Sequence, residues 1–508
     1  MKSTYKEKVV KPPSTAQLTK ISTELGYDLG QDEILEYKDV IDDSLQATYQ
    51  RFNEIPDPKL PVKYPRTPGY RPTGPKDNPY NAWYWRCDIP GAPNGKLQGK
   101  SIAIKDCICV AGVPMMMGSQ ILEGYTPDVD ATVVTRILDA GGRIMGKAVC
   151  ENLCNSGGSF NAATGPVVHP LDETRMTGGS SSGCAALVAG GHVDMAVGAD
   201  QGGSIRNPAG RCGIVGLKPT LGLVPYTGIV PMEFSLDHVG LMAKTVHDVA
   251  LLLEVTAGSD DGLDYRQPHE LQVENYVNQL TSEISHLRLG LLTEGFSHPQ
   301  SEPDVDQCIK RAAKHLATES GATLQDVSVP MHLDATVIYD AFTEGGLWPD
   351  RFFETNGYQV TSLQKWFAQG LKTRANDISA DFKVASIKGR YLQKNYNDEF
   401  FFKARNLAWK LRTVFDEALT KVDVLIMPTN PKKARPLPLP NIPLREYLQC
   451  CSENYVNTCT FNMTGHPALS INAGFSDGLP VGMMIVGRKF DEATVLNVAY
   501  AYERIRKM

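Results

Sequence analysis

The sequence predicts an α/β fold for most of a chain of 508 residues. Between residues 97 and 198, apolar runs of strand length alternate with segments of helical periodicity, which is typical of α/β proteins. Hydrophobic residues make up 42% of the chain and charged residues 21%, an ordinary composition for a globular protein with a large core. We expect two parts: an N-terminal arm over residues 1–79 and one large body over residues 80–508.

Residues 1–79 predict a helical arm followed by an extended, proline-rich strap. A helix capped by Ser14 runs to about Leu25, and a second helix begins near Asp32. Apolar side chains recur every three or four residues along the second helix and form a stripe of Ile34, Tyr37, Ile41, Leu45, Tyr49 and Phe52. The stripe must pack either on the body of the same chain or on a partner subunit, which would give a homodimer through the arm. Eight prolines between Pro56 and Pro79 fix φ and remove N–H donors, which predicts the strap.

The body opens with a strand, a helix and a second strand. The first strand has its apolar part at residues 101–104 and ends on Lys105. A lysine at the end of a strand is commonly solvated, so its position alone indicates no function. The helix covers about residues 130–140, and the second strand covers residues 143–145. The predicted inner face of the helix consists of Val133, Val134, Ile137 and Leu138.

Two motif matches in this region lack their usual context. Residues 141–148 nearly match the phosphate-binding loop G-x-x-x-x-G-K-[ST], but Ala148 cannot ligate magnesium and the predicted strand lies inside the loop. Residues 179–183 match the nucleophile elbow G-x-S-x-G, which needs a strand immediately before it. Residues 169–175 precede it and are predicted to form a polar loop, so we favour neither motif.

A glycine- and serine-rich stretch at residues 176–219 is the strongest candidate for a site. It holds two turns of small residues, 178–183 and 200–204, and both carry hydroxyl side chains. Between them we predict a helix over residues 184–191 and a short strand over residues 195–198. Glycine is common where backbone approaches a ligand or adopts a positive φ, so the two turns can face each other across one site.

The hydroxyl groups of these turns indicate nucleophilic catalysis without histidine. Serine needs a base to attack at neutral pH, and His192, which lies between the turns, is predicted to be at the surface. A lysine can be that base if burial makes its neutral form accessible, because desolvation lowers its pKa. Lys105 and two serines are then a sufficient set, in which Ser204 attacks and Ser180 carries its proton to Lys105.

The second turn can also stabilise the oxyanion that forms during acyl transfer. Successive N–H groups of Gln201, Gly202 and Gly203 can point at one oxygen atom. Because glycine has no side chain, an acyl group can come close to this backbone. We place Gly179, beside Ser180, among the same substrate-facing residues.

These residues resemble the amidase signature family. The stretch GGSSSG…GADQGGSIRNPAGRCGIVGLKPT and the strand IAIKD at Lys105 are similar to the motifs of that family. The spacings of 75 residues from Lys105 to Ser180 and 24 residues from Ser180 to Ser204 are typical of it. The resemblance implies that Lys105 is the general base, that Ser180 is a bridging serine, often on a cis peptide bond, and that Ser204 is the nucleophile.

The resemblance covers residues 80–508 and is weakest at about 260–400, where we place a variable substrate pocket. Segments 462–470 and 478–494 are similar to C-terminal elements of the family, and the chain is most similar to its Rhodococcus-type amidases. The family implies a large, mixed, twisted sheet sandwiched between helices. An aromatic-rich region within the weak part is either packing or pocket wall, and it comprises Tyr339, Phe342, Trp348, Phe352, Phe353 and Trp366.

Residues beside the nucleophile receive roles from the same resemblance. Asp200 and Arg206 are predicted to form a charge-assisted pair that fixes the loop. Gln201 stands where many relatives carry threonine, so specificity can differ there. Asn207 stands where relatives often carry an apolar residue, which makes it a candidate for substrate contact.

Composition argues against several other classes of protein. A net charge of −6 and a pI of about 6.0 argue against a binder of nucleic acid or of membrane surfaces. We find no apolar run of about 18 residues and no secretory signal, so we expect a cytoplasmic protein. The 11 cysteines lack the spacing of a zinc site, and we expect buried thiols and neither a metal nor an organic cofactor.

The sequence thus predicts hydrolysis of a small-molecule carboxylic acid amide through a seryl acyl-enzyme. A neutral aliphatic or aromatic amide is the substrate that the family implies. Three alternatives stay open: the glutaminase component of a tRNA-dependent amidotransferase, an ester or cyclic-amide hydrolase with the same triad, and a catalytically silent scaffold protein.

Overall fold

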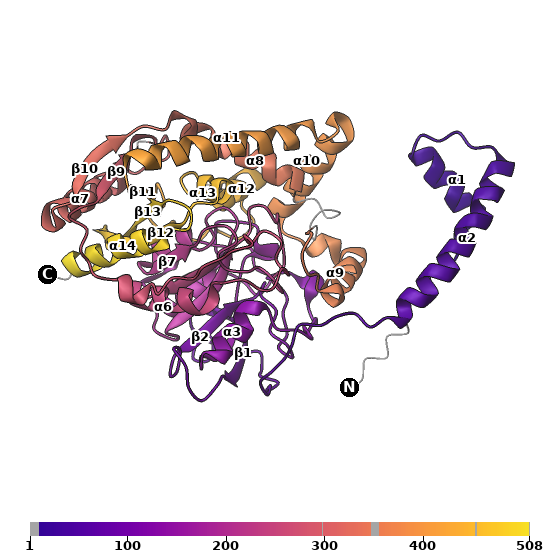
Figure 1. Cartoon of the computed structure of the whole chain (residues 1–508), viewed down its shortest axis with the longest axis horizontal. Coiled ribbons are helices and arrows are strands. Elements are labelled where there is room, and N and C mark those ends of the chain that lie inside the picture. The colour runs from indigo at the N-terminus through magenta and orange to yellow at the C-terminus, as the bar shows by residue number, and fades with distance from the viewer. Residues whose placement is uncertain (1–9, 297, 347–354, 453–454, 507–508) are drawn as a thin grey trace. The chain divides into compact units, whose positions relative to one another are not determined.

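The computed structural model describes residues 10–296, 298–346, 355–452 and 455–506. The chain divides into a smaller unit, Met1–Lys59, and a larger unit, Leu60–Met508. In Figure 1 the smaller unit is a pair of helices, and the larger unit is a sheet with helices around it.

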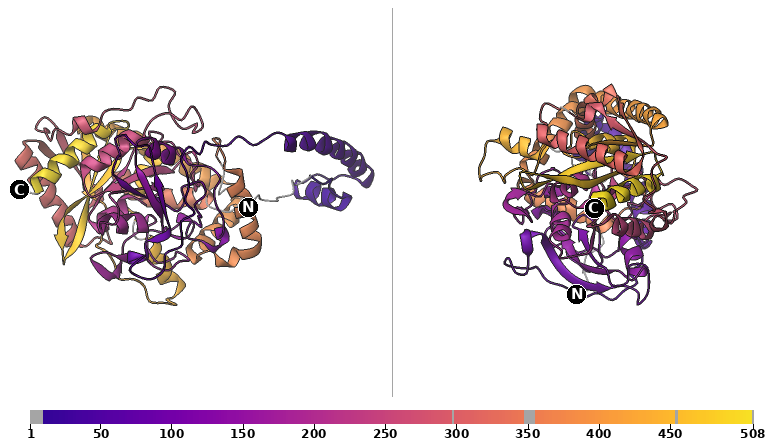
Figure 2. Two further views of the ribbon diagram at one scale, coloured as in Figure 1. Left: turned by 90° about the horizontal axis from the view of Figure 1, so that it is seen from below. Right: turned by 90° about the vertical axis from the view of Figure 1, so that its left-hand side faces the viewer.

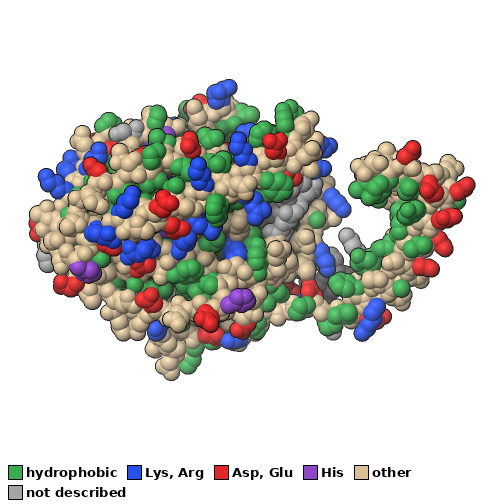
Figure 3. All heavy atoms as spheres, turned by 45° about the horizontal axis from the view of Figure 1, so that its top comes forward, with side chains coloured by type: hydrophobic (Ala, Val, Ile, Leu, Met, Phe, Trp, Pro, Cys, Tyr) green, Lys and Arg blue, Asp and Glu red, His purple; other side chains and the backbone are tan. Residues whose placement is uncertain are grey.

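The smaller unit contains the two predicted helices, α1 (Thr15–Glu24) and α2 (Gln31–Glu54). Ser14 caps α1, because its Oγ accepts the N–H of Gln17 at 3.3 Å while its own N–H donates to Gln17 Oε1 at 2.8 Å. Of the apolar stripe on α2, Ile34 is buried, whereas Tyr37 and Phe52 are 55% and 63% exposed. Figure 3 shows acidic and apolar side chains along different edges of this unit. Both helices are confirmed, and much of the stripe is left uncovered.

The larger unit is built on a mixed sheet of eleven strands. In spatial order the strands are β1 (Trp83–Pro90), β3 (Arg143–Ala148), β2 (Ser101–Lys105), β6 (Met195–Asp200), β8 (His238–Ala243), β7 (Val215–Lys218), β12 (Ala468–Ser476), β13 (Leu479–Gly487), β11 (Val424–Pro428), β9 (Arg288–Leu292) and β10 (Thr323–Val327). Strand β2 is parallel to β3 and β6, and β9 is parallel to β10 and β11, whereas the other pairs are antiparallel. The large mixed sheet that the family resemblance implied is thus confirmed.

Helices cover both faces of this sheet, as Figure 2 shows. They are α3 (Thr132–Asp139), α4 (Ser182–Ala189), α5 (Arg206–Cys212), α6 (Val246–Thr256), α7 (Pro303–Ser320), α8 (Ala335–Gly346), α9 (Thr361–Arg374), α10 (Ala380–Tyr396), α11 (Glu399–Lys421), α12 (Leu444–Ser452), α13 (Cys459–Thr464) and α14 (Glu492–Arg506). Side chains alternate along a strand, so β2 contributes Ile102 and Ile104 to one hydrophobic core and Ala103 to another. Helices α3 and α6 pack into the first core, and α4 and α5 pack into the second.

Several local expectations hold, and one is wrong. The inner face predicted for residues 130–140 is buried, although the helix starts only at Thr132. Residues 169–175, expected to be a polar loop, instead contribute to a small two-stranded sheet of β4 (Val168–His169) and β5 (Asp172–Met176). Arg175 and Asp172, both on β5, form an ion pair. A strand therefore does precede the first glycine turn, but it is not part of the large sheet.

The aromatic-rich region has no single role. Phe342 lies in the core, Trp366 packs on Tyr125 with 6.0 Å between the ring centroids, and Tyr339 lines a cavity. Trp348, Phe352 and Phe353 lie outside the described residues. The 11 cysteines are buried free thiols, as expected. Among the described residues, no helix combines the length and apolar character that crossing a membrane requires.

Candidate active site

The two glycine-rich turns meet Lys105 at one edge of the sheet. Lys105 is the last residue of β2, and the turn at residues 201–204 follows β6 directly. Because β2 and β6 are parallel neighbours, their carboxyl ends lie at the same edge. Lys105 Nζ donates to Ser180 Oγ at 2.8 Å and to the carbonyl oxygen of Ala199 at 3.2 Å. Neither Lys105 nor Ser180 is exposed, so this lysine is not the solvated strand end that its position alone suggested.

Ser180 sits in a tightly packed turn immediately before α4. The peptide bond from Gly179 to Ser180 is cis. A Cβ atom at position 179 would lie 2.3 Å from the carbonyl oxygen of Gly158, so only glycine is accommodated there. The carbonyl oxygen of Ser180 accepts the N–H of Glu151 at 3.2 Å.

Ser204 ends the second turn, just before α5, and lines a cavity. Its carbonyl oxygen accepts the N–H of Ser181 at 3.2 Å, which joins the two turns through their backbones. Gly203 has φ of 135°, and a Cβ atom there would lie 2.2 Å from Thr458 Oγ1 and 2.6 Å from Asn207 Nδ2. Glycine at position 203 is therefore required by both the backbone conformation and the available space.

Asp200 holds this turn from behind through a buried set of hydrogen bonds. Its carboxylate accepts the N–H groups of Gly203 at 2.7 Å and Ile205 at 3.1 Å. It also accepts Arg206 Nη2 and Asn462 Nδ2, each at 2.9 Å. Burial by itself would raise the pKa of Asp200, but the charge and hydrogen bonds of Arg206, together with Asn462, outweigh it and hold the pKa well below its ordinary value. The predicted pair of Asp200 and Arg206 is thus present as an ion pair.

The guanidinium of Arg206 ties the turn to the C-terminal part of the chain. Its Nη1 donates to the carbonyl oxygen of Thr458 at 2.9 Å, and its Nη2 donates to Asn462 Oδ1 at 2.7 Å. Thr458 in turn donates through its hydroxyl to the carbonyl oxygen of Gly202 at 2.6 Å. Sequence reasoning assigned no role to Thr458 or Asn462; the only available signal was that segment 462–470 resembles a family element.

The carboxylate next to Lys105 in the sequence is paired with another lysine. Asp106 Oδ1 lies 3.2 Å from Lys147 Nζ, and Asp106 Oδ2 accepts the N–H groups of Met116 and Met117 at 3.0 and 2.7 Å. Within the described part of the chain, no carboxylate oxygen lies within 4 Å of Lys105 Nζ. Lys105 is therefore buried without a counter-charge.

Burial and the neighbouring thiols act in opposite directions on the pKa of Lys105. Burial is the largest single influence and lowers this pKa, because the ammonium is removed from water. The sulfurs of Cys154, Cys107, Cys150 and Cys184 would raise it above its ordinary value if they carried thiolate charge. Burial raises the pKa of all four thiols, however, so they are neutral near neutral pH. With neutral thiols, burial lowers the pKa of Lys105 and favours its basic form.

Gln201 is a buried side chain with one unsatisfied atom. Its Nε2 donates to the hydroxyl of Tyr226 at 2.9 Å, and that hydroxyl donates to the carbonyl oxygen of Val230 at 3.3 Å. Gln201 is 5% exposed, and its Oε1 has no hydrogen-bond partner among the described residues. Behind it, burial raises the pKa of Asp237 to about 8.

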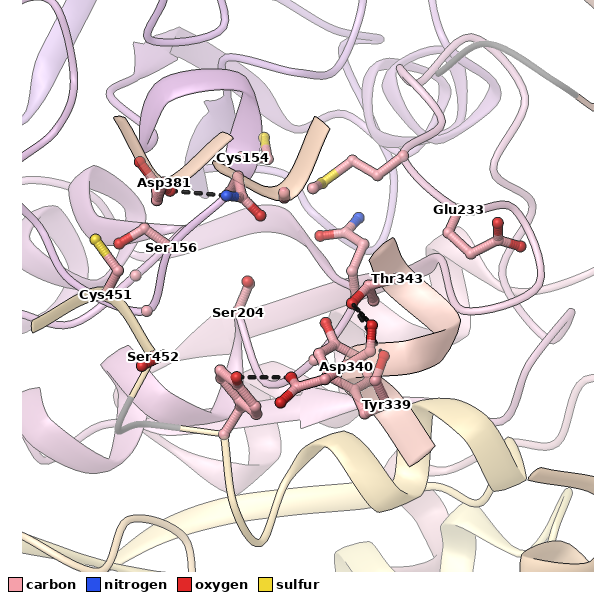
Figure 4. Close-up of a pocket in the computed structure, with 18 of the residues that line it drawn as sticks. Cys154, Ser156, Ser204, Glu233, Tyr339, Asp340, Thr343, Asp381, Cys451 and Ser452 are labelled. Atoms are coloured by element: carbon pink, nitrogen blue, oxygen red, sulfur yellow. Dashed lines mark hydrogen bonds between the residues drawn. The ribbon is translucent and has the colours of Figure 1, made fainter. Parts of the chain in front are cut away.

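A cavity of about 210 Å³ opens above Ser204. Figure 4 shows Ser204 near its middle, with Tyr339, Asp340 and Thr343 on one side and Ser156, Asp381 and Cys451 on the other. Gly179, Gln201, Gly202 and Asn207 also line it. Lys105, Ser180 and Gly203 are not among the lining residues, and Asp200 and Arg206 are buried behind the turn.

Tyr339 and Asp340, on α8, are the main cavity residues whose placement the sequence did not predict. A Cβ atom at Gly202 would lie 2.3 Å from the Tyr339 hydroxyl oxygen, so this hydroxyl rests against the turn at residues 201–204, called the nucleophile turn below for the role proposed for Ser204. Tyr339 was noted only as one of several aromatic residues. Asp340 carries no motif, because its position depends on how α8 packs against the sheet.

Comparison with known proteins agrees with this geometry. The family model described as Amidase matches residues 82–496. The chain belongs to the amidase family. It is 41% identical to an enantioselective amidase of Rhodococcus rhodochrous, over 96% of this chain and 95% of that protein. It is also 38% identical to one subunit of the glutamyl-tRNA(Gln) amidotransferase of Methanosarcina barkeri, over 82% of this chain and 87% of that one.

Solved structures show the same family. A peptide amidase in complex with the inhibitor chymostatin is 26% identical and superposes with a TM-score of 0.67, over 81% of this chain and 84% of that one. The corresponding glutamyl-tRNA(Gln) amidotransferase subunit of Thermotoga maritima is 31% identical with a TM-score of 0.67, over the same shares of the two chains. The amidase family, its fold and the similarity to a Rhodococcus amidase are confirmed, and the chain is a hydrolytic amidase.

Proposed function

We propose that Ser204, Ser180 and Lys105 form the triad of this amidase and hydrolyse a carboxylic acid amide to the acid and ammonia or an amine. The observation that carries this proposal is the buried hydrogen bond of 2.8 Å from Lys105 Nζ to Ser180 Oγ, beneath the turn that bears Ser204. Ser204 attacks the amide carbonyl carbon, and its proton passes through Ser180 to the neutral amine of Lys105. Burial without a counter-charge supports the neutral form of this lysine.

The same relay completes both halves of the reaction. The proton held by Lys105 returns through Ser180 to the amide nitrogen, which leaves as ammonia or an amine and yields an acyl ester on Ser204. Water then attacks this ester, the relay removes the proton from the water, and Ser204 regains its own proton. No metal or organic cofactor takes part in these steps.

For the oxyanion we propose the backbone N–H groups of Gln201, Gly202 and Ser204 as donors. Among the described residues these three groups have no protein acceptor, whereas the N–H of Gly203 donates to Asp200 at 2.7 Å. This corrects the expectation that Gly203 is a donor to the oxyanion. Its contribution is the absence of a side chain, which lets the turn adopt its conformation against Thr458.

The region at about 260–400 supplies part of the cavity wall, as the proposal of a variable pocket requires. Tyr339 and Asp340 come from α8, and Asp381 comes from α10. We assign substrate selection to this wall and the chemistry to the turns. We keep residues 1–79 as an accessory arm and propose that it joins two chains into a cytoplasmic homodimer, since Tyr37 and Phe52 expose an apolar surface on α2.

The glutaminase alternative finds less support in the cavity. Glutamine carries a carboxylate that needs a cationic partner, but no lysine, arginine or histidine occurs among the described residues that line the cavity. Four carboxylates line it instead: Glu233, Asp340, Glu344 and Asp381. Purification with partner proteins, together with ATP dependence, would favour this alternative. An ester or cyclic-amide hydrolase would use the same triad and is distinguished by substrate assays alone.

The test is ammonia release from acetamide, benzamide, phenylacetamide and glutamine by the native chain and by Ser204→Ala. We expect release by the native chain that falls by at least about 10³-fold in the variant, because the nucleophile is lost. Ser452→Ala is the matched control, since Ser452 lines the same cavity and its hydroxyl donates only to the carbonyl oxygen of Leu448. Release that persists in Ser204→Ala would exclude Ser204 as the nucleophile.

A further inference from the structure

The side of the cavity formed by α8 carries negative charge next to the nucleophile turn. Asp340 and Glu344 are four residues apart on this helix and both line the cavity. Tyr339, beside Asp340, rests against Gly202 of the nucleophile turn. Figure 4 shows Asp340 and Ser204 bordering the same open space. A group held by Asp340 would therefore belong to a molecule that also reaches Ser204.

Asp340 is the carboxylate of this side that lacks a cation. Its Oδ1 accepts the hydroxyl of Tyr455 at 2.9 Å, and no lysine or arginine nitrogen lies within 4 Å of it in the described part of the chain. Glu344, by contrast, is paired with Lys388 at 2.5 Å. Burial is the largest influence and raises the pKa of Asp340; the hydrogen bond from Tyr455 and the charge of Lys388 lower it, and the charge of Glu344 raises it. The pKa stays above its ordinary value, so a cation in direct contact would stabilise the anion further.

Aromatic rings border the same carboxylate. The rings of Tyr339 and Tyr455 lie 5.2 Å apart between centroids, and Tyr455 is the residue that holds Asp340 Oδ1. Tyrosine faces attract ammonium groups, so rings and carboxylate favour the same kind of ligand. Across the cavity, Asp381 is already engaged, since it accepts Asn155 Nδ2 at 2.7 Å.

A second, independent feature also calls for an N–H donor. Gln201 is nine-tenths buried and lines the cavity, and its Oε1 lacks a partner among the described residues. The orientation of its amide is fixed, because the Tyr226 hydroxyl gives its own proton to Val230 and must accept from Gln201 Nε2. A buried acceptor without a donor costs free energy that a substrate N–H would recover.

We propose that this amidase selects amides that carry a protonated amino group besides the reacting carboxamide, with the ammonium bound by Asp340 and an N–H accepted by Gln201 Oε1. This inference rests on the proposed function and narrows its substrate class. It departs from the neutral amides that the family resemblance implied. The ammonium can belong to the acyl chain or to the departing amine, and the two cases require different substrates.

Two pairs of substrates of equal size test the proposal at pH 7.5. In the first pair, 5-aminopentanamide carries the ammonium on its acyl chain, and hexanamide is its neutral counterpart. In the second pair, N-(2-aminoethyl)acetamide carries the ammonium on the departing amine, and N-propylacetamide is its neutral counterpart. We expect kcat/KM to favour the charged member by about tenfold or more in one pair, because hydrogen bonds to buried charged groups are strong. A ratio near one in both pairs would overturn the proposal.

Variants assign the preference to Asp340. We expect Asp340→Asn to bring the ratio of charged to neutral substrate close to one. Asp334→Asn is the matched control, since Asp334 is exposed, lies six residues earlier and does not line the cavity. A ratio that Asp340→Asn leaves at its native value would refute the assignment.

A binding measurement separates this proposal from the proposed function. Ser204→Ala protein is titrated with 5-aminopentanamide and hexanamide, and with the second pair, in a calorimeter. If no amide is hydrolysed, the proposed function fails, but the calorimeter still decides on the preference. Tighter binding of a charged member, abolished by Asp340→Asn in the same background, supports the cation subsite, and equal binding within both pairs contradicts it.

Discussion

Replacing Asp200 by asparagine should destabilise the larger unit and lower its activity. The carboxylate of Asp200 is fully buried and carries the counter-charge of Arg206. It also holds two N–H groups of the turn that bears the nucleophile, those of Gly203 and Ile205. An asparagine fits the same space but is neutral, and its NH₂ group would face hydrogen-bond donors.

The magnitude follows from these contacts. Leaving the Arg206 guanidinium buried without its partner costs about 3–5 kcal/mol. One N–H group that loses its acceptor adds about 1–3 kcal/mol. The total of roughly 4–8 kcal/mol is comparable with the whole stability of a typical domain, about 5–15 kcal/mol. A displacement of the turn by about 1 Å would in addition lower kcat/KM by about 10²-fold.

Urea unfolding followed by tryptophan fluorescence, with ammonia release measured in parallel, checks this expectation. Asp326→Asn serves as control, because Asp326 is an exposed carboxylate on β10. The double variant Asp200→Asn/Arg206→Met removes both charges, so its destabilisation should be smaller than the sum of the two single variants by about 2–3 kcal/mol. Additive effects, or an Asp200→Asn protein with native stability and activity, would refute the reasoning, and the double variant decides if the single one does not fold.

Three further predictions concern the base, the turn and the arm. Activity should rise with pH until the pH passes the pKa of Lys105, because only the neutral amine accepts a proton and burial favours that form. A pH profile of kcat/KM measures this rise, and Lys105→Met should abolish activity. A rate that falls over this pH range would contradict the assignment of Lys105 as the base. Gly203→Ala should lower kcat/KM by about 10²-fold, because its Cβ would lie 2.2 Å from Thr458 Oγ1, whereas Gly262→Ala, also at positive φ but with open space, should leave kinetics unchanged. Removal of residues 1–59 should leave ammonia release intact and convert dimer to monomer in light scattering; a dimer that persists would exclude the arm as the interface.

The residues of the proposed triad could be picked out from the sequence because each lies in a recognisable local pattern. Lys105 lies at the end of a strand and the two serines lie in glycine-rich turns, and strands β2 and β6 are short apolar runs that periodicity reveals. The parallel pairing of these strands places Lys105 beside Ala199 near the end of β6, and the turn before α4 brings Ser180 to the same lysine. The proposed roles of these residues came with the family resemblance, because the position of Lys105 at a strand end is also compatible with a solvated side chain.

The rest of the site depends on contacts between distant parts of the chain. Arg206 is hydrogen-bonded to Thr458 and Asn462, which are separated from it by 252 and 256 positions in the sequence. Nothing in the local pattern of either segment indicates that contact. The hairpin at β4 and β5 was missed because its residues are mostly polar and show no apolar alternation. In the sequence Asp340 is one more charge on an amphipathic helix, and only the packing of α8 turns it towards the cavity.

These two sets of contacts divide the site into a fixed part and an adjustable part. The nucleophile turn is held by Asp200, Arg206 and Asn462, none of which lines the cavity. Part of the cavity wall comes from α8, α10 and α12, and the Tyr339 hydroxyl of α8 contacts the turn at Gly202. A change at Asp340 should therefore alter the choice of substrate with little effect on the turn, whereas a change at Asp200 should reduce the rate for every substrate alike. If the proposed roles are correct, selectivity at Asp340 can change without loss of the chemistry, because among the residues that the structure describes Asp340 has no hydrogen bond to the turn that bears Ser204.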